Sequence, residues 1–232
     1  MQLFYDPSIS KLSMQFSFDK EESRHIVKVL RKKTGDILHV TNGSGWLFTT
    51  EIILATEHKC NVKITESAFI DRRQYHLHLA VAPTKMNDRY EWFLEKATEI
   101  GIDEITPLLC DRSERKILKV DRMEKILVSA MKQSGQYYLP KLNEPVGFSE
   151  FISSEKTGLK AIAHCLDEQK QTLKNIIKPG KTLTLLIGPE GDFTKKEIEE
   201  ALLHAAIPVA LGSTRLRTET AGIVAATLLR NL

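Results

Sequence analysis

The chain has 232 residues, of which 33 are Lys or Arg and 30 are Asp or Glu, giving a formal net charge of +3. Its hydrophobic content of 42% and charged content of 27% are ordinary for a soluble globular protein, and they exclude a disordered chain, a collagen and a coiled coil. Three well-separated cysteines argue against a disulfide framework and a cysteine-based metal site, and they indicate a reducing, cytoplasmic location. The first residues lack the basic and apolar regions of a signal peptide, and no uncharged stretch is long enough to span a membrane, so we expect neither membrane nor metal binding.

The first seventy residues contain short β-rich runs separated by Gly, Asn and Asp, which predicts a small β-barrel or sandwich. One helix over 21–32 interrupts this pattern, because Ile26, Val27 and Leu30 fall at roughly helical spacing. The charged stretch 71–74 marks a boundary, so we expect one domain over 1–72 and a second over 73–232. The β-rich runs are 16–18, 37–40, 46–48 and 62–64.

From residue 75 onward, expected strands alternate with expected helices, which predicts an α/β domain with a largely parallel sheet. Asp88 with Glu91, and Thr194 with Glu197, have the spacing of capping boxes, and Gly101 is placed to end the helix that starts at Asp88. The expected strands are 76–82, 104–109, 159–165, 182–187 and 207–211. The expected helices start at Asp88, Asp121 and Thr194 or cover 169–177 and 219–229.

Two glycine-containing loops follow strands of this second half, Gly188–Phe193 and Leu211–Thr220. Ligands of open α/β sheets bind at the carboxyl ends of strands, where glycine allows close approach and the next helix offers free N–H groups. The alternative is that these glycines only turn the chain. Neither loop matches a dinucleotide fingerprint or a phosphate-binding P-loop. The histidines show no metal-binding spacing, but His164 ends a strand where it can border the two loops.

Basic residues cluster in two places, and such clusters suit contact with RNA phosphates when amides and aromatic rings lie among them. The first cluster includes Arg24, Lys28, Arg31 and Lys32. The second covers 112–141, with eight Lys or Arg against three acidic residues, and includes Arg112, Arg115 and Gln133. The alternative for both clusters is a solvated helix face.

The strings Ile187-Gly188-Pro189-Glu190-Gly191-Asp192-Phe193 and Leu216-Arg217-Thr218-Glu219-Thr220-Ala221 resemble the two C-terminal motifs of the RsmE family. These are uracil-N3 methyltransferases of small-subunit (16S) ribosomal RNA that belong to the SPOUT superfamily. Lys96–Gly101 and His25–Arg31 support the resemblance, which covers nearly the whole chain. Asp192 stands where the family usually has a second glycine, and Gly135-Gln136 where it often has an arginine.

The resemblance implies a PUA-like N-terminal β-barrel domain and a C-terminal SPOUT α/β domain with a deep trefoil knot. It also implies a homodimer that acts on ribosomal RNA or the small ribosomal subunit with S-adenosyl-L-methionine (SAM) as cofactor. The backbones of the two loops would hold the cofactor, together with the His164 side chain that borders them. The cofactor-binding residues expected on this basis are His164, Ile187, Gly188, Pro189, Gly191, Leu211, Gly212, Ser213 and Leu216.

Uracil N3 is a weakly acidic imide nitrogen, so its methylation needs proton removal and in-line geometry with a methyl donor. We expect Arg217 to stabilise the negative charge on the uracil oxygens. Glu190 or Glu219 would act as the base or hold Arg217 in place, and an ion pair of Arg217 with either acid at the subunit interface is the structural alternative. Two other functions stay open: a SPOUT methyltransferase for another RNA position or a ribose 2′-oxygen, and a non-catalytic RNA-binding assembly factor.

Overall fold

The computed structural model describes residues 2–154, 158–176 and 181–230. The chain forms two compact units, which are treated separately below. The first unit consists of Met1–Arg72 with Met131–Leu139, and the second of Arg73–Ala130 with Pro140–Leu232.

The first unit is built on a five-stranded sheet in the order β1-β3-β4-β5-β2. All its strand pairs are antiparallel except β1 with β3. The expected β-rich domain is therefore confirmed, although its central hairpin of β4 and β5 is longer than the sequence pattern indicates. Its core packs Phe4, Phe18, Ile26 and Phe48. The strands are β1 (Leu3–Tyr5), β2 (Gln15–Ser17), β3 (Ile37–Thr41), β4 (Trp46–Thr56) and β5 (Lys59–Phe69).

The helix expected over 21–32 is shorter and changes its winding. The α-helix α1 (Lys20–Arg24) begins where the Asp19 side chain accepts a hydrogen bond from the backbone N–H of Glu22, and η1 (His25–Val29) continues it as a π-helix. The wider turn places Ile26 in the core of this unit, while Val27 and Leu30 pack against that core from its edge. The helical path ends at Arg31, whose φ of 55° is left-handed.

The segment Met131–Leu139 belongs to the first unit, whereas the sequence pattern assigned it to the second domain. Ser44 pairs with Tyr138 in an antiparallel bridge, and the Gly45 N–H donates to the Tyr137 carbonyl at 2.9 Å. The Tyr138 hydroxyl donates to the Ile70 carbonyl at 2.7 Å. Gly45 is required here, because a Cβ at this position would overlap the Tyr138 hydroxyl. These are contacts between residues far apart in the sequence, which no local pattern predicts.

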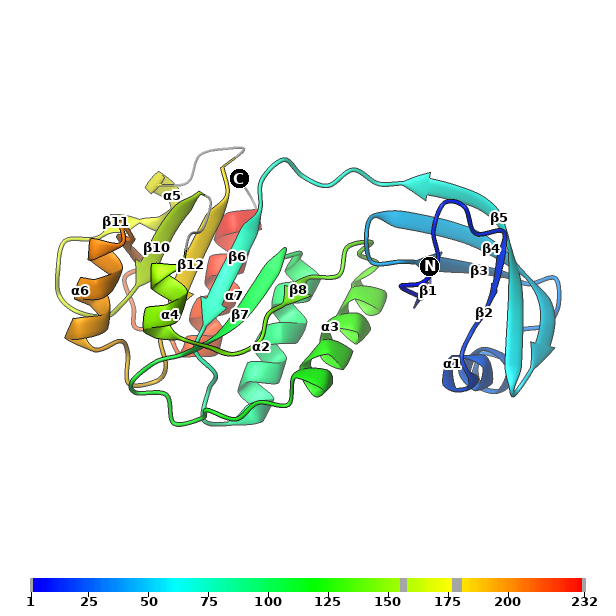
Figure 1. Cartoon of the computed structure of the whole chain (residues 1–232), viewed down its shortest axis with the longest axis horizontal. Helices are drawn as coiled ribbons and strands as arrows, with labels where there is room; N and C mark the ends of the chain where they lie inside the picture. Colours follow the sequence, from blue (N-terminus) through cyan, green and yellow to red (C-terminus); the bar gives the residue numbers. More distant parts are fainter. Residues whose placement is uncertain (1, 155–157, 177–180, 231–232) are drawn as a thin grey trace. The chain divides into compact units, whose positions relative to one another are not determined.

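The second unit is built on a parallel sheet in the order β11-β13-β10-β12-β6-β7-β8, with β9 also paired to β7. Figure 1 shows β10, β12, β6, β7 and β8 of this sheet. The expected α/β class and the five expected strands are confirmed, with ends that differ by one or two residues. The threading of the chain through a knot, which the family resemblance implies, stays a prediction. The strands are β6 (Leu77–Val81), β7 (Glu104–Leu109), β8 (Lys141–Leu142), β9 (Val146–Gly147), β10 (Leu159–Ala163), β11 (Gln171–Thr172), β12 (Leu183–Ile187) and β13 (Ile207–Ala210).

Helices cover both faces of this sheet. On one face α2 packs against α7, and on the other α4 and α6 enclose a core that contains Leu186 and Phe193. None of the helices in the described part of the chain is long and apolar enough to cross a membrane. The helices are α2 (Asn87–Ile100), α3 (Val120–Ser134), α4 (Phe148–Ser153), α5 (Leu173–Ile176), α6 (Lys195–Leu203) and α7 (Thr218–Arg230).

The helix ends agree with local sequence signals in two of three cases. Thr194 and Glu197 form the expected capping box, and Gly101 ends α2 with a φ of 97°. The capping box expected at Asp88 and Glu91 is wrong, because α2 starts after Met86 and Glu91 pairs with Arg122 instead. The helix expected over 169–177 is also largely wrong: residues 171–172 form β11, α5 is one turn long, and Ile177 lies outside the described residues.

Candidate active site

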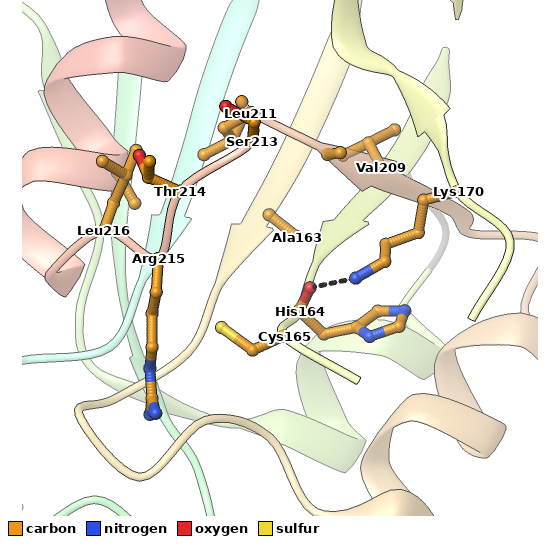
Figure 2. Close-up of a pocket in the computed structure, with 13 residues that line it drawn as sticks. Ala163, His164, Cys165, Lys170, Val209, Leu211, Ser213, Thr214, Arg215 and Leu216 are labelled. Atoms are coloured by element: carbon orange, nitrogen blue, oxygen red, sulfur yellow. Dashed lines mark hydrogen bonds between the residues drawn. The ribbon is translucent and has the colours of Figure 1, made fainter. Parts of the chain in front are cut away.

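A pocket of about 230 Å³ lies at the carboxyl ends of β10 and β13. Because these strands are parallel neighbours, the loops that leave them converge at one edge of the sheet. In Figure 2, Leu216, Thr214 and Arg215 line one side, while Lys170 and Val209 lie opposite, with His164 and Cys165 between them. Of the expected cofactor residues, the pocket contains His164, Leu211, Gly212, Ser213 and Leu216.

His164 is the most unusual polar side chain of this pocket. It is only 6% exposed, and neither ring nitrogen has a hydrogen-bond partner among the described residues. Burial, assisted by the nearby Lys170 ammonium, lowers the pKa of its imidazole, which favours the neutral ring. Lys170 itself donates to the His164 carbonyl at 2.9 Å (Figure 2). Among the described residues, the ring therefore keeps unsatisfied hydrogen-bonding capacity beside the pocket.

Gly212 is exposed and lines the pocket. A Cβ added at this glycine would meet no atom within 4 Å, so its small size serves nothing within the protein itself. Ser213, Thr214 and Arg215, which follow it, are exposed. This loop therefore presents its backbone to the pocket.

The loop after β12 is closed by contacts with its own neighbours. A Cβ at Gly188 would lie 3.1 Å from both the backbone nitrogen and the ring of Phe193, a buried core residue. The Gly188 carbonyl accepts a hydrogen bond from the Thr218 hydroxyl at 3.0 Å, and the Gly191 carbonyl accepts one from the Arg112 guanidinium at 2.7 Å. Ile187, Gly188, Pro189 and Gly191 are not among the residues that line this pocket. Their loop still borders it, because Ile187 pairs with Ala163 of β10 and Arg215 donates to the Glu190 carbonyl at 3.5 Å. Contact of these four residues with the cofactor stays a prediction.

Asp192 ties this loop to the end of β10. Its φ of 61° is left-handed, a conformation that glycine adopts most easily and Asp tolerates better than most residues. One carboxylate oxygen accepts from the Cys165 N–H at 2.8 Å, and the other accepts from the Phe193 N–H at 2.8 Å. The carboxylate thus adds two hydrogen bonds that a glycine in this position would lack.

A second, more open pocket of about 690 Å³ shares Arg215 and Leu216 with the first. Its walls come from the first turns of α2, with Asp88, Arg89 and Trp92, and from the segment that enters α7. Arg217 and Glu219, both expected catalytic residues, line this pocket. The two pockets are therefore neighbours across the loop after β13.

The two candidate acids have different environments. Glu219 is 7% exposed, and one carboxylate oxygen lies 3.8 Å from Arg89 Nε while the other has no hydrogen-bond partner among the described residues. Glu190 is exposed, and its carboxylate accepts from the Lys85 N–H at 2.9 Å. Arg217 is exposed, and in the described part of the chain it pairs with neither acid. An ion pair of Arg217 at a subunit interface stays the structural alternative.

The expected RNA-binding residues lie in both units, and they differ in whether their side chains already contact other parts of the protein. In the first unit, Arg24, Arg31 and Gln133 are exposed, Lys28 makes a loose 3.8 Å ion pair with Glu57, and Lys32 lines a shallow pocket. In the second unit, Arg112 binds the Gly191 carbonyl and Arg115 binds the Lys85 carbonyl at 2.9 Å. These last two guanidinium groups therefore hold loops of the candidate site together.

The residues that line the two pockets and were not expected from the sequence include Arg89, Trp92, Cys165 and Lys170. Arg89 and Trp92 lie in the first turns of α2, the helix that follows β6, so the rule that ligands bind beyond the carboxyl ends of strands points to this region. The pattern around Asp88 was interpreted only as a helix start. Lys170 carried no signal, because its segment was expected to be helical.

Two family models match the chain: an RNA methyltransferase domain over residues 71–230 and an RNA methyltransferase PUA domain over 18–65. A protein of Buchnera aphidicola subsp. Acyrthosiphon pisum named ribosomal RNA small subunit methyltransferase E is 31% identical over 227 residues, covering 94% of this chain and 88% of that protein. The crystal structure of a probable rRNA-methyltransferase from Porphyromonas gingivalis is 36% identical with a TM-score of 0.92, covering 100% of this chain and 98% of that one. A putative methyltransferase from Legionella pneumophila, solved in complex with the bound cofactor SAM, is 31% identical with a TM-score of 0.87, covering 99% and 96%.

Proposed function

Because this chain belongs to the RsmE family, whose curated members are named ribosomal RNA small subunit methyltransferase E, we propose that it methylates N3 of a uracil in small-subunit ribosomal RNA. The cofactor is SAM, as in the Legionella pneumophila relative of known structure. The observation that carries the proposal is the pair of adjoining pockets beyond the sheet edge, which share Arg215 and Leu216. One pocket suits a cofactor, and the other suits the base that receives the methyl group.

The residues of the first pocket fit this cofactor. Among the described residues, nothing satisfies the two buried ring nitrogens of His164 and nothing fills the space beside Gly212. Lys170 adds a cation that can face the carboxylate of the methionine moiety. When bound, SAM supplies a sulfonium-activated methyl group. The residues of the pocket fix the position of the cofactor and exclude water from the side of it that they cover.

The residues of the second pocket fit the chemistry of the uracil ring. Arg217 carries a planar fork of N–H donors that can bind the uracil carbonyl oxygens as negative charge spreads onto them. Glu219 lines the same pocket and has a buried carboxylate oxygen without a hydrogen-bond partner among the described residues, so we assign it the proton of N3. We assign Glu190 a structural role, because its carboxylate accepts the Lys85 N–H and anchors the preceding loop.

The first unit contributes RNA affinity in this scheme. Arg24, Lys28 and Arg31 would contact phosphates, while Arg112 and Arg115 act mainly on the loops they bind. We also propose that the protein works as a homodimer and meets its substrate in the cytoplasm, where ribosomal RNA is assembled.

The experiment that tests the function is nucleoside mass spectrometry on small-subunit RNA. Purified protein, SAM and small subunits from a strain lacking the gene should yield N3-methyluridine at one site, and the same nucleoside should be missing from the deletion strain. Arg217→Ala protein serves as the matched control, because it should bind SAM without supporting fast transfer. Formation of a 2′-O-methylated nucleoside, or of none, would contradict the proposal.

A further inference from the structure

Trp92 is a large aromatic side chain that the fold leaves at the surface of the second pocket. It is 45% exposed, whereas the next two residues of α2, Phe93 and Leu94, are completely buried. An exposed indole forgoes the stabilisation that burial of its large apolar surface would give, and this one lines the same pocket as Arg217 and Glu219. We propose that Trp92 is a stacking platform for a single unpaired uracil base, whose imide edge then faces Arg217 and Glu219.

The position of this platform is fixed by packing directly behind it. Phe93 lies against Gly222 of α7 so closely that a Cβ at Gly222 would come within 2.6 Å of the Phe93 ring. This close contact holds α2 against the first turns of α7, which begins at Thr218. Trp92 belongs to α2 and Glu219 to α7. Because these two helices are packed closely, the distance between the two sides of the pocket is fixed.

The charges around the platform suit uracil. Arg89, Arg215 and Arg217 line the pocket against two acids, Asp88 and Glu219, so an incoming RNA segment meets an excess of positive charge. Uracil offers two carbonyl acceptors with one N–H donor between them. Guanidinium donors and the free Glu219 oxygen complement that pattern, whereas cytosine presents an amino group and an unprotonated N3.

The platform also explains how a base reaches the cofactor. A base inside a duplex cannot present N3, because that atom is engaged in pairing, so it must be unpaired and held outside the stack. The second pocket adjoins the cofactor pocket at Arg215 and Leu216. A ring stacked on Trp92 is therefore presented at the boundary with the methyl donor. This inference rests on the proposed function for the identity of the base.

Kinetics of Trp92 variants test the platform with the complete protein. Trp92→Ala should lower kcat/KM for small subunits by about 10- to 100-fold, which is the effect expected when one base-stacking aromatic ring is removed. Trp92→Phe should retain most of the wild-type kcat/KM. SAM affinity and molecular mass by light scattering should match the wild type. Leu203→Ala is the matched control, because Leu203 is an exposed apolar residue of the same unit (86%) that lies on α6 outside both pockets.

Fluorescence supplies a readout that does not depend on turnover. The chain has two tryptophans, Trp46 and Trp92, so Trp46→Phe protein reports on Trp92 alone. With S-adenosylhomocysteine present, a uridine oligoribonucleotide should quench this emission more strongly than a cytidine oligoribonucleotide of equal length.

The outcomes separate the platform from the proposed function. A wild-type kcat/KM in Trp92→Ala would overturn the platform. A loss of kcat/KM accompanied by weaker SAM binding would also overturn it. So would a loss accompanied by a changed molecular mass, because Trp92 would then be covered by a second copy of the chain. Equal quenching by the two oligonucleotides would also overturn it. Uridine-selective quenching without formation of N3-methyluridine would support the platform and refute the proposed methylation.

Discussion

The loops after β12 and β13 look alike in sequence but differ in what they contact. Each has a glycine just after a parallel strand, a glutamate further on, and a helix behind it. Gly188 makes room for Phe193, and its loop is closed by Thr218 and Arg112, whereas Gly212 faces open space in a pocket. A glycine at the end of a strand can thus admit either a neighbouring core residue or a ligand, and only the surroundings tell which.

The largest expected effect separates the chemical roles of the two loops. Arg217→Ala should slow single-turnover methyl transfer by about 10² to 10³, the size found when one preorganised charge-stabilising donor is removed. SAM affinity should change little, Arg217→Lys should recover little because it lacks the planar fork, and a higher pH should partly restore the rate.

Glu190→Ala is the counterpart in the closed loop. It removes one hydrogen bond to Lys85 and should lower stability by about 0.5–1.5 kcal/mol with a near-wild-type rate. If Glu190→Ala slows methyl transfer and Arg217→Ala does not, our assignment of the two loops is reversed.

The next largest effects are expected from valine substitutions at the two loop glycines, one of which should change stability and the other SAM binding. Gly188→Val should cost about 1–3 kcal/mol of unfolding free energy, because its side chain must displace Phe193. Gly212→Val should leave the unfolding free energy within about 0.5 kcal/mol but weaken SAM binding by about tenfold or more, because the new side chain occupies the pocket. Urea unfolding and isothermal titration measure the two quantities. If both variants lose SAM affinity while both keep their stability, the first loop also faces the cofactor.

The smallest effect concerns pH and the buried ring of the open site. The pKa of His164 is lowered by burial from its ordinary value of 6.5, so below that pH the unfolded chain takes up a proton that the folded protein resists. The free energy of unfolding should therefore fall as the pH drops from 7.5 to 5.5. His164→Gln should reduce this dependence, and His58→Gln, at an exposed turn, should preserve it. An identical pH dependence in wild-type and His164→Gln protein would show that the ring is not desolvated.

Local signals predicted what local physics decides. The Thr194–Glu197 capping box, the left-handed stop at Gly101 and the alternation of apolar strands with helices need only neighbouring residues, and all three are present. The π-helical turn at His25–Val29 and the pairing of Glu91 with Arg122 depend on tertiary packing, so periodicity missed both.

The same division applies to the candidate site. His164 and Gly212 were found because they follow strands in the chain, and they line the first pocket. Trp92 and Arg89 were missed because their position matters only once α2 lies against α7. The RsmE motifs drew attention equally to both glycine loops, since a motif does not record which of its glycines face inward.

The assignment of Met131–Leu139 to the first unit has a consequence for synthesis. Domains tend to fold one after another as they leave the ribosome, starting from the N-terminus. Here the first unit still lacks the partner of Ser44 and the hydroxyl that binds the Ile70 carbonyl when residue 72 has been made. The ribosome must first produce the strands and helices of 73–130, which belong to the second unit. The N-terminal unit is therefore first to begin folding but cannot be completed until residue 139 has emerged.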